Sequence, residues 1–201
     1  MPETEPRTRR VFVACCLRPT DAALLAGWSA QHLDLTGLRT IPAEHLHATM
    51  FFAAAAADEA VESMASTVRD ICWFGAAFEG EKLSLFGRNA IGVSIRWTDS
   101  AGAALQKAMG RGTHRSVKDD PDSLSPRISC LRSLFAIFGE AFRPWSPHVT
   151  LARTRKRIDP RTIRLPRPPA DRWYMDRICL FESRLSPEGP LYKVLATSRN
   201  C

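Results

Sequence analysis

The sequence predicts an α+β fold with mainly antiparallel sheets, formed as a single domain over residues 1–201. In each half of the chain, helical segments alternate with hairpin-like pairs of apolar strands, which is typical of this class. The order of a strand, a helix and further strands also occurs twice, once in each half. With 201 residues, 45% of them hydrophobic and 24% charged, the chain has the size and composition of one ordinary globular domain.

In the first half, strands are expected where apolar and β-branched residues run between turn-forming residues, at 10–17, 38–41 and 46–52. A helix is expected at 20–32, where Thr20 can cap the first turn. A second is expected at 58–72, where acidic residues stand at the positive end of the helix dipole. The next elements are a hairpin of strands at 78–86 and 90–97, joined by Gly87-Arg88-Asn89, and a helix at 100–109.

The second half begins with a polar segment, residues 110–130, that contains two prolines and several serines. We expect an irregular insertion there. The remaining elements are expected to be a helix at 131–142, a strand at 147–152, and two final strands at 176–183 and 191–197. The basic, proline-rich connection at 153–172 is long for a compact domain, and such connections are usually functional or disordered.

Membrane and secreted proteins are poorly matched by this chain. Its longest apolar stretch, residues 50–57, is far below the roughly 18 to 20 residues that cross a bilayer. The first ten residues are polar and lack the apolar core of a secretory signal. We therefore expect a cytoplasmic protein without a membrane partner, and a monomer.

The six cysteines show no Cys-x-x-Cys pair and no regular spacing. We expect all of them to be reduced and to serve as small buried hydrophobic side chains. Cys15 and Cys16 are adjacent in an expected strand, so they should point to opposite faces of the sheet.

Positive charge is concentrated in the second half. The net charge is +7, and between residues 153 and 177 nine arginines and lysines face three aspartates. A cluster of this density attracts polyanions by releasing their counterions, which favours RNA, DNA or a phosphorylated metabolite as the partner. A solvated surface loop is the alternative interpretation.

A short motif occurs in both halves, as His47-Ala48-Thr49 and His148-Val149-Thr150. Because side chains alternate along a strand, each strand presents its imidazole and its hydroxyl on the same face. Two such strands facing one cleft would supply two titratable bases and two hydroxyl donors. Phosphoryl transfer uses such a set, with one group to take a proton, one to give a proton, and donors to hold the phosphate oxygens.

The motif has competing explanations. A third match, His114-Arg115-Ser116, lies in the polar insertion without apolar flanks and serves as a decoy. The histidines could also be half-buried strand residues and the threonines ordinary β-formers. His45 and His47 could bind zinc, but no further ligand stands at the required spacing, so we predict no metal and no cofactor.

The motifs and their flanks resemble the 2H phosphoesterases, and within them the bacterial and archaeal RNA 2′,3′-cyclic phosphodiesterases once called 2′-5′ RNA ligases. The matching segments are Arg10-Val11-Phe12-Val13-Ala14, Glu44-His45-Leu46-His47-Ala48-Thr49, Pro147-His148-Val149-Thr150-Leu151-Ala152-Arg153, and Ile178-Cys179-Leu180-Phe181-Glu182-Ser183 followed by Gly189 and Tyr192. They occur in the family's order over nearly the whole chain.

The resemblance implies a bilobal fold with two pseudo-symmetric lobes around a central cleft. It also implies metal-independent hydrolysis of an RNA 2′,3′-cyclic phosphate end, or of a cyclic nucleotide, to a 2′-phosphomonoester. By this likeness His148 would activate the water and His47 would protonate the leaving O3′. Thr49 and Thr150 would bind the phosphate oxygens, and Arg153 would bind the substrate as a forked donor. The basic segment after Arg153 would guide the RNA.

Some features depart from the family pattern. The insertion before the second motif is longer, and Phe52-Ala53-Ala54 replaces the usual Leu-Gly after the first motif. Two alternatives therefore stay open beside hydrolysis. One is a 2′-5′ RNA ligase acting on tRNA halves, and the other is a non-catalytic RNA-binding module that uses the basic segment.

Overall fold

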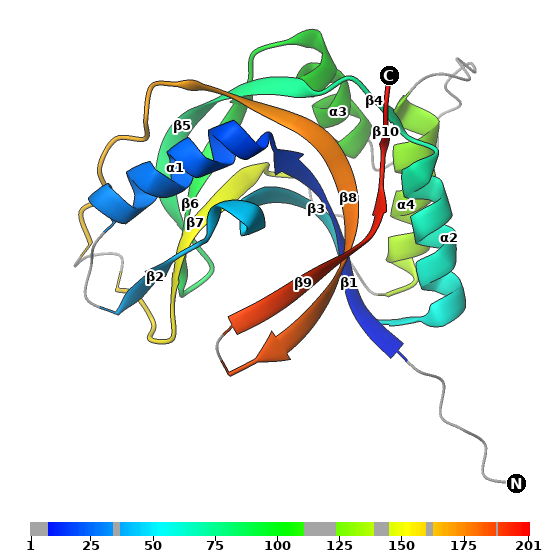
Figure 1. Cartoon of the computed structure of the whole chain (residues 1–201), viewed down its shortest axis with the longest axis horizontal. Helices are drawn as coiled ribbons and strands as arrows, with labels where there is room; N and C mark the ends of the chain where they lie inside the picture. Colours follow the sequence, from blue (N-terminus) through cyan, green and yellow to red (C-terminus); the bar gives the residue numbers. More distant parts are fainter. Residues whose placement is uncertain (1–7, 34–36, 111–123, 139–144, 160–162, 188) are drawn as a thin grey trace, which may run out of the picture.

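The computed structural model describes residues 8–33, 37–110, 124–138, 145–159, 163–187 and 189–201 (Figure 1). Its strands are β1 Thr8–Leu17, β2 Leu38–Thr40, β3 His47–Ala57, β4 Cys72–Trp73, β5 Ala76–Phe86, β6 Ala90–Trp97, β7 His148–Thr154, β8 Arg172–Ser186, β9 Gly189–Thr197 and β10 Arg199–Asn200. Its helices are α1 Pro19–His32, the short 3-10 turn η1 Ala43–His45, α2 Asp58–Arg69, α3 Ser100–Gly110 and α4 Leu124–Ala136.

One eight-stranded antiparallel sheet dominates the fold, with strand order β2-β7-β6-β5-β8-β1-β3 and β9 paired to β8. Although β3 and β7 lie at or near opposite ends of this path, they also contact each other. The sheet is therefore strongly curled (Figure 1). This curl brings the strands that begin at His47 and His148 together.

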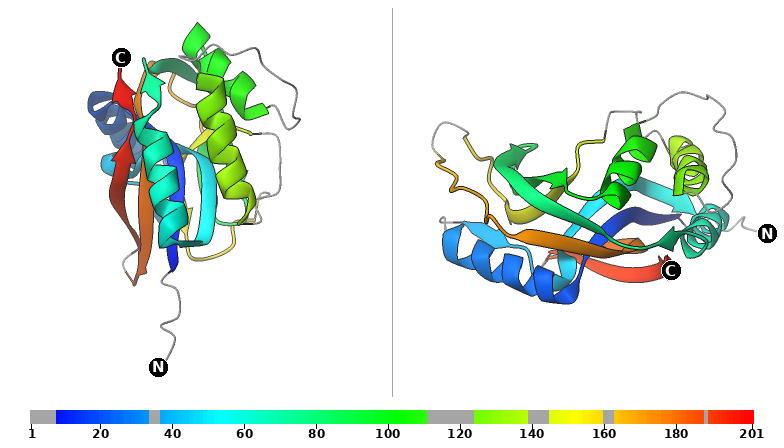
Figure 2. Two further views of the ribbon diagram at one scale, coloured as in Figure 1. Left: turned by 90° about the vertical axis from the view of Figure 1, so that its right-hand side faces the viewer. Right: turned by 90° about the horizontal axis from the view of Figure 1, so that it is seen from above.

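The helices lie on both sides of the sheet. In Figure 2, α1 lies on one side, while α3 and α4 lie on the other and α2 packs beside α4. Apolar residues from all four helices and most strands form the main core, which includes Leu25, Val61, Leu105 and Ile128. The helices thus pack on apolar strand residues, among them Ala48 and Val149 next to the motif histidines.

The predicted α+β class with mainly antiparallel pairing is confirmed, and the expected elements of the first half are all present. The hairpin turns at Gly87, whose φ of +66° lies in the left-handed region that glycine adopts most readily. The strands of the two halves form one hydrogen-bonded sheet, in which β1 and β5 pair with β8 and β2 and β6 pair with β7. None of the helices in the described ranges has the length and apolar character of a membrane span.

The insertion expected at 110–130 is partly wrong. Helix α4 begins at Leu124, within the segment that we expected to be irregular, and it ends at Ala136. Pro126 lies in the first turn of this helix, where the missing backbone N–H leaves no bond unmade, so the proline does not prevent a helix. Residues 111–123, with the decoy His114, and residues 139–144 lie outside the described residues.

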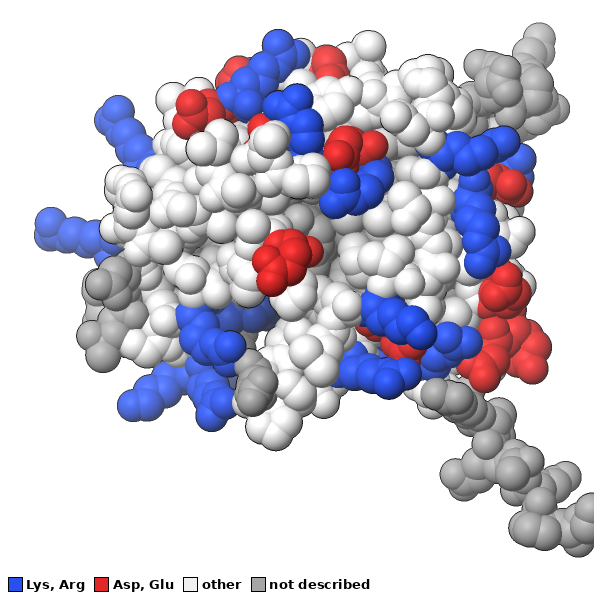
Figure 3. All heavy atoms as spheres, in the orientation of Figure 1, with Lys and Arg blue, Asp and Glu red and all other residues white. Residues whose placement is uncertain are grey.

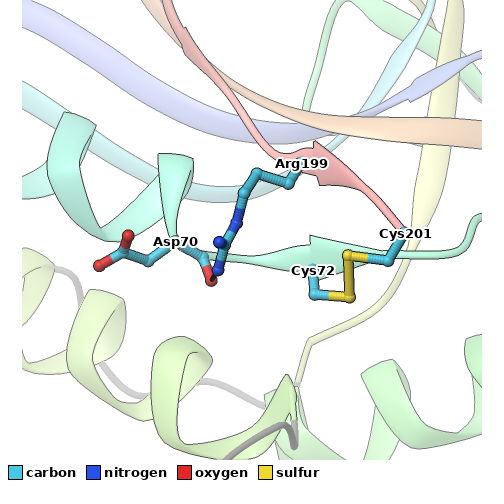
Figure 4. The surroundings of a disulfide bond; sticks show 4 residues. All are labelled: Asp70, Cys72, Arg199 and Cys201. Atoms are coloured by element: carbon cyan, nitrogen blue, oxygen red, sulfur yellow. Dashed lines mark hydrogen bonds between the residues drawn. A yellow bond between two sulfur atoms is a disulfide. The ribbon is translucent and has the colours of Figure 1, made fainter.

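The prediction of six reduced cysteines is also wrong, because Cys72 and Cys201 form a disulfide across a sequence separation of 129 residues (Figure 4). The cause is tertiary: β10 pairs in parallel with β4, which carries the C-terminus to Cys72. The Arg199 guanidinium also donates to the Asp70 carbonyl at 3.3 Å. The sequence spacing of these cysteines contains no sign of this pairing.

The remaining cysteines differ in environment. Cys15, Cys16 and Cys179 are buried thiols, as predicted, whereas Cys130 is exposed. Cys15 packs in the main core and Cys16 in a second, smaller cluster. The two neighbours therefore point to opposite faces of β1, as the strand period predicts.

Candidate active site

The first motif lies at the start of β3. His47 and Thr49 are half-buried, whereas Ala48, Met50 and Phe51 are buried. The alternation breaks at Met50, where the register between β3 and β1 shifts by one residue. Such a bulge sends two successive side chains into the core and reverses the faces of the residues that follow.

The second motif repeats this pattern on β7. His148 and Thr150 are half-buried, while Leu151 and Ala152 are both buried. The register between β7 and β6 shifts at Leu151, so that a bulge again follows the threonine. As a result Arg153 follows two inward residues, and its exposed side chain lies on the face of His148 and Thr150.

The two motifs are brought together in space. The indole Nε1 of Trp145, three residues before His148, donates to the Thr49 carbonyl at 2.8 Å. The charges of Arg153 and His148, both in the second half, also reach His47, where they add to the effect of burial in lowering its pKa. Thr49 is thus linked to Trp145 by a hydrogen bond, and His47 to Arg153 and His148 by their charges. Four of the five predicted site residues therefore interact across the two halves.

The imidazole of His47 is packed among aromatic rings. The Phe12 ring lies 4.9 Å away in a stacked arrangement, and the Tyr192 ring lies edge-on at 5.7 Å. Burial is the main cause that lowers the pKa of His47 to about 4, and the charges of His45, Arg153 and His148 act in the same direction. His47 is therefore neutral at neutral pH.

The tautomer of His47 follows from its hydrogen bond. Its Nδ1 lies 2.7 Å from the His45 carbonyl, which can only accept, so the neutral ring carries its proton on Nδ1. This leaves the lone pair on Nε2 for a substrate.

The imidazole of His148 has the same arrangement in a more open environment. Its Nδ1 donates to the Ser146 carbonyl at 3.0 Å, again two residues earlier in the chain. The Phe86 ring stacks on it at 3.8 Å and 9°. Burial and, to a lesser extent, the Arg153 charge lower the pKa of His148. Nε2 is again the nitrogen that is free to act as base or acid.

The other predicted residues are available to a ligand. The hydroxyls of Thr49 and Thr150 make no hydrogen bond within the part of the chain that the structure describes. The exposed Arg153 guanidinium adds to the effect of burial in lowering the pKa of His47 and of His148, and it opposes the rise that burial causes in the pKa of Tyr192. The positive charge of Arg153 therefore acts on both histidines and on Tyr192. The set offers two imidazole nitrogens, two hydroxyls and one guanidinium to an anion.

A strongly basic cavity of about 1020 Å³ is lined by Arg153 of this set, whereas the two histidines and two threonines of the motifs are not among its lining residues. His45, Tyr192 and Arg153 border it on the side of the motifs. Its charged lining residues are Arg39, Arg153, Arg155, Lys156, Arg157 and Asp159. In Figure 3, cationic side chains gather at the lower left, over the end of the molecule where β2 and the end of β7 lie in Figure 1.

The basic segment predicted at 153–177 is therefore divided. Its first four cations line the cavity. Arg177, by contrast, pairs with Asp176 at 2.9 Å, and Arg161 lies outside the described residues.

The zinc site considered for His45 and His47 has no further ligands: among the described residues, no group of three or more His, Cys, Asp or Glu could hold a metal ion. His45 instead packs against the Tyr192 ring at 4.7 Å.

Several residues of the site were missed from the sequence. Phe12, Phe86 and Trp145 contact the motif residues, although aromatic side chains are most simply interpreted as core. Trp145 offers a local signal, since it stands just before the second motif. Phe86 offers none, because β7, which carries its partner His148, is distant in the sequence.

The fold is shared with solved structures, although neither a protein family model nor a curated protein matches the chain. Escherichia coli LigT in its apo form is 20% identical, with a TM-score of 0.64, over 95% of this chain and 96% of LigT. A phosphoesterase matches at 20% identity and a TM-score of 0.64, over 96% of this chain and 97% of that protein. A protein of Thermus thermophilus matches at 20% identity and a TM-score of 0.63, over 94% of this chain and 96% of that protein.

Proposed function

We propose that this protein is a metal-independent phosphodiesterase of the 2H type that hydrolyses RNA 2′,3′-cyclic phosphate ends to 2′-phosphomonoesters. The observation that carries the proposal is the pair of histidines, His47 and His148, each held through Nδ1 by a carbonyl two residues earlier. The shared fold supports it, since LigT has been crystallised with phosphate and with 3′-AMP.

In the proposed reaction, one imidazole Nε2 takes a proton from water as the water oxygen attacks phosphorus. The P–O3′ bond breaks, and the other imidazolium gives its proton to O3′, which leaves a 2′-phosphate and a free 3′-hydroxyl. Two groups acting in this way as base and acid each contribute about 10² to 10⁴ in rate. The hydroxyls of Thr49 and Thr150 and the Arg153 guanidinium would hold the non-bridging oxygens.

The environments of the two histidines favour one distribution of roles. The pKa of His47 falls to about 4, so its neutral form is ready to accept a proton. Burial also lowers the pKa of His148, but this imidazole stacks on the Phe86 ring in a more open environment than that of His47, so it is the more accessible of the two to a proton from solvent. We therefore propose His47 as base and His148 as acid, the reverse of the order expected from the family resemblance.

The basic cavity supports an RNA rather than a neutral substrate. Arg155, Lys156 and Arg157 are exposed and line the cavity next to Arg153, where they can neutralise phosphates upstream of the cyclic end. If a 5′-hydroxyl replaced water as the nucleophile on the cyclic phosphate, the P–O3′ bond would break and leave a 2′-5′ diester with a free 3′-hydroxyl, so 2′-5′ ligation is the second candidate. The basic lining alone would also suit a non-catalytic RNA-binding module.

Hydrolysis of 2′,3′-cyclic AMP and of a cyclic-ended oligonucleotide, both with EDTA present, tests the proposal. We expect a 2′-phosphomonoester from both, with a loss of about 10² to 10⁴ in kcat for His47→Ala and for His148→Ala. The matched control is His32→Ala, because His32 is exposed and, among the described residues, its hydrogen bond and its ring contact are both with Trp28 of its own helix.

The outcomes separate the candidates. Full turnover by either site variant would rule out the paired mechanism, and loss of activity in EDTA would indicate a metal enzyme. Salt-sensitive RNA binding with no product at any pH would indicate a binding module. Accumulation of a joined 2′-5′ product from tRNA halves would indicate a ligase.

A further inference from the structure

We infer that Phe86 is a positioning residue for His148, and that Gly92 is present to make room for it. The inference rests on the proposed function, in which the direction of the His148 Nε2 decides proton transfer. Phe86 ends β5 and Gly92 lies in β6, so both belong to the hairpin that pairs with the second motif strand.

The contact between the two rings is close and parallel. The Phe86 and His148 centroids are 3.8 Å apart with an interplanar angle of 9°, the shortest separation among the described ring pairs. On its other edge His148 donates Nδ1–H to the Ser146 carbonyl. One contact fixes the plane of the imidazole and the other fixes its rotation within that plane, so together they set where Nε2 points.

Gly92 allows this packing. It is the cross-strand partner of Thr150, on the strand next to the motif. A Cβ atom at residue 92 would lie 2.9 Å from the Phe86 Cδ2 and 2.8 Å from the Val149 carbonyl oxygen. Both distances are too short for a real Cβ contact, so a larger residue at position 92 must shift the Phe86 ring, the β7 backbone next to His148, or both.

The charged surroundings of His148 are limited. Arg153, on its own strand, acts on it electrostatically, and the charge of His148 in turn lowers the pKa of His47 on β3. From β5 the contact is the uncharged Phe86 ring, which excludes water from one face of the imidazole. Loss of this ring should therefore hydrate His148 and bring its pKa back toward the ordinary value, in addition to loosening its orientation.

The test uses Phe86→Leu and Gly92→Ala, with Phe74→Leu as the matched control because Phe74 is 66% exposed and contacts neither motif. We expect a loss of about ten- to a hundredfold in kcat on 2′,3′-cyclic AMP, with less change in KM, since misplaced catalytic groups lower kcat. The pKa of His148, followed by NMR titration of its ring proton, should rise in both variants. Phe86→Tyr should keep the kcat of the parent protein and the parent pKa of His148, because the tyrosine ring can stack in the same way.

A matched substitution in the other half gives a further check. Phe12→Leu should change the NMR titration of His47 and leave that of His148 unchanged. An unaltered kcat and an unaltered His148 titration in Phe86→Leu would overturn the inference. If Phe86→Leu fails to fold, Gly92→Ala and Phe86→Tyr decide the question by the same two readouts. Because the NMR titration needs no substrate, it also answers when no protein hydrolyses the cyclic phosphate, an outcome that would reject only the proposed function.

Discussion

The two motif strands, β3 and β7, share one local arrangement in different surroundings. In both, a His-x-Thr sequence is followed by a bulge, and the histidine Nδ1 bonds the carbonyl two residues earlier. His47 is enclosed by Phe12 and Tyr192, and its pKa falls to about 4. His148 is covered on one face by Phe86, and burial lowers its pKa as well. The same three-residue motif can thus hold its imidazole in two different environments.

The residue that follows each bulge also differs. On β7 this residue is Arg153, a cation on the motif face. At the matching place on β3 stands Phe52, with the guanidinium of Arg10 from the neighbouring strand 4.6 Å above its ring. Each half therefore has a cation near the phenol of Tyr192, where burial raises the pKa and both arginines oppose that rise. The comparison indicates that chemical roles follow from the packing around a motif rather than from the motif itself.

The largest expected effect separates the roles of the two histidines. A cyclic substrate whose 3′ oxygen is replaced by sulfur needs no protonation of its leaving group, because a thiolate is a stable leaving group. His148→Ala, which removes the proposed acid, should regain most of its loss of about 10² to 10⁴ on this substrate. His47→Ala should regain little. Rescue of His47→Ala alone would restore the order expected from the family resemblance.

Thr49→Val and Thr150→Val test whether the halves contribute equally to holding the phosphate. Each variant removes a hydroxyl and keeps the shape, and we expect a loss of about 10² in kcat, as for the removal of one donor to a developing charge. Thermal unfolding should be unchanged, because neither hydroxyl bonds to another described residue. A large loss of stability without a loss of kcat would contradict the assignment.

The smallest effect concerns stability and pH. Because folding lowers the pKa of His47 from 6.5 to about 4, the unfolded chain binds more protons than the native protein between these values. Stability is therefore retained above pH 6.5 and lost as pH falls toward 4. Between pH 6.5 and 5 the loss from His47 should be about 2 kcal/mol. Urea unfolding should show a shallower pH dependence in His47→Asn, whereas His32→Asn should behave as the parent protein. Equal slopes in all three proteins would contradict the burial of His47.

Much of the secondary structure follows from local sequence. The alternation of His47 and Thr49 with buried neighbours, the turn at Gly87 and the acidic start of α2 are short-range patterns, and each predicts its element correctly. The same strand period places Cys15 and Cys16 on opposite faces. These features need only the preferences of neighbouring residues and the period of the element.

Other features depend on which distant segments meet. The bulges at Met50 and Leu151, the hydrogen bond from Trp145 to the first motif and the Cys72–Cys201 disulfide all involve partners on other strands. Such pairings are decided by the order and curl of the whole sheet, which no local pattern encodes. The residue types thus determined that two imidazoles and two hydroxyls would stand on strand faces. Tertiary packing alone decided that they share one site and that one imidazole is buried more deeply than the other.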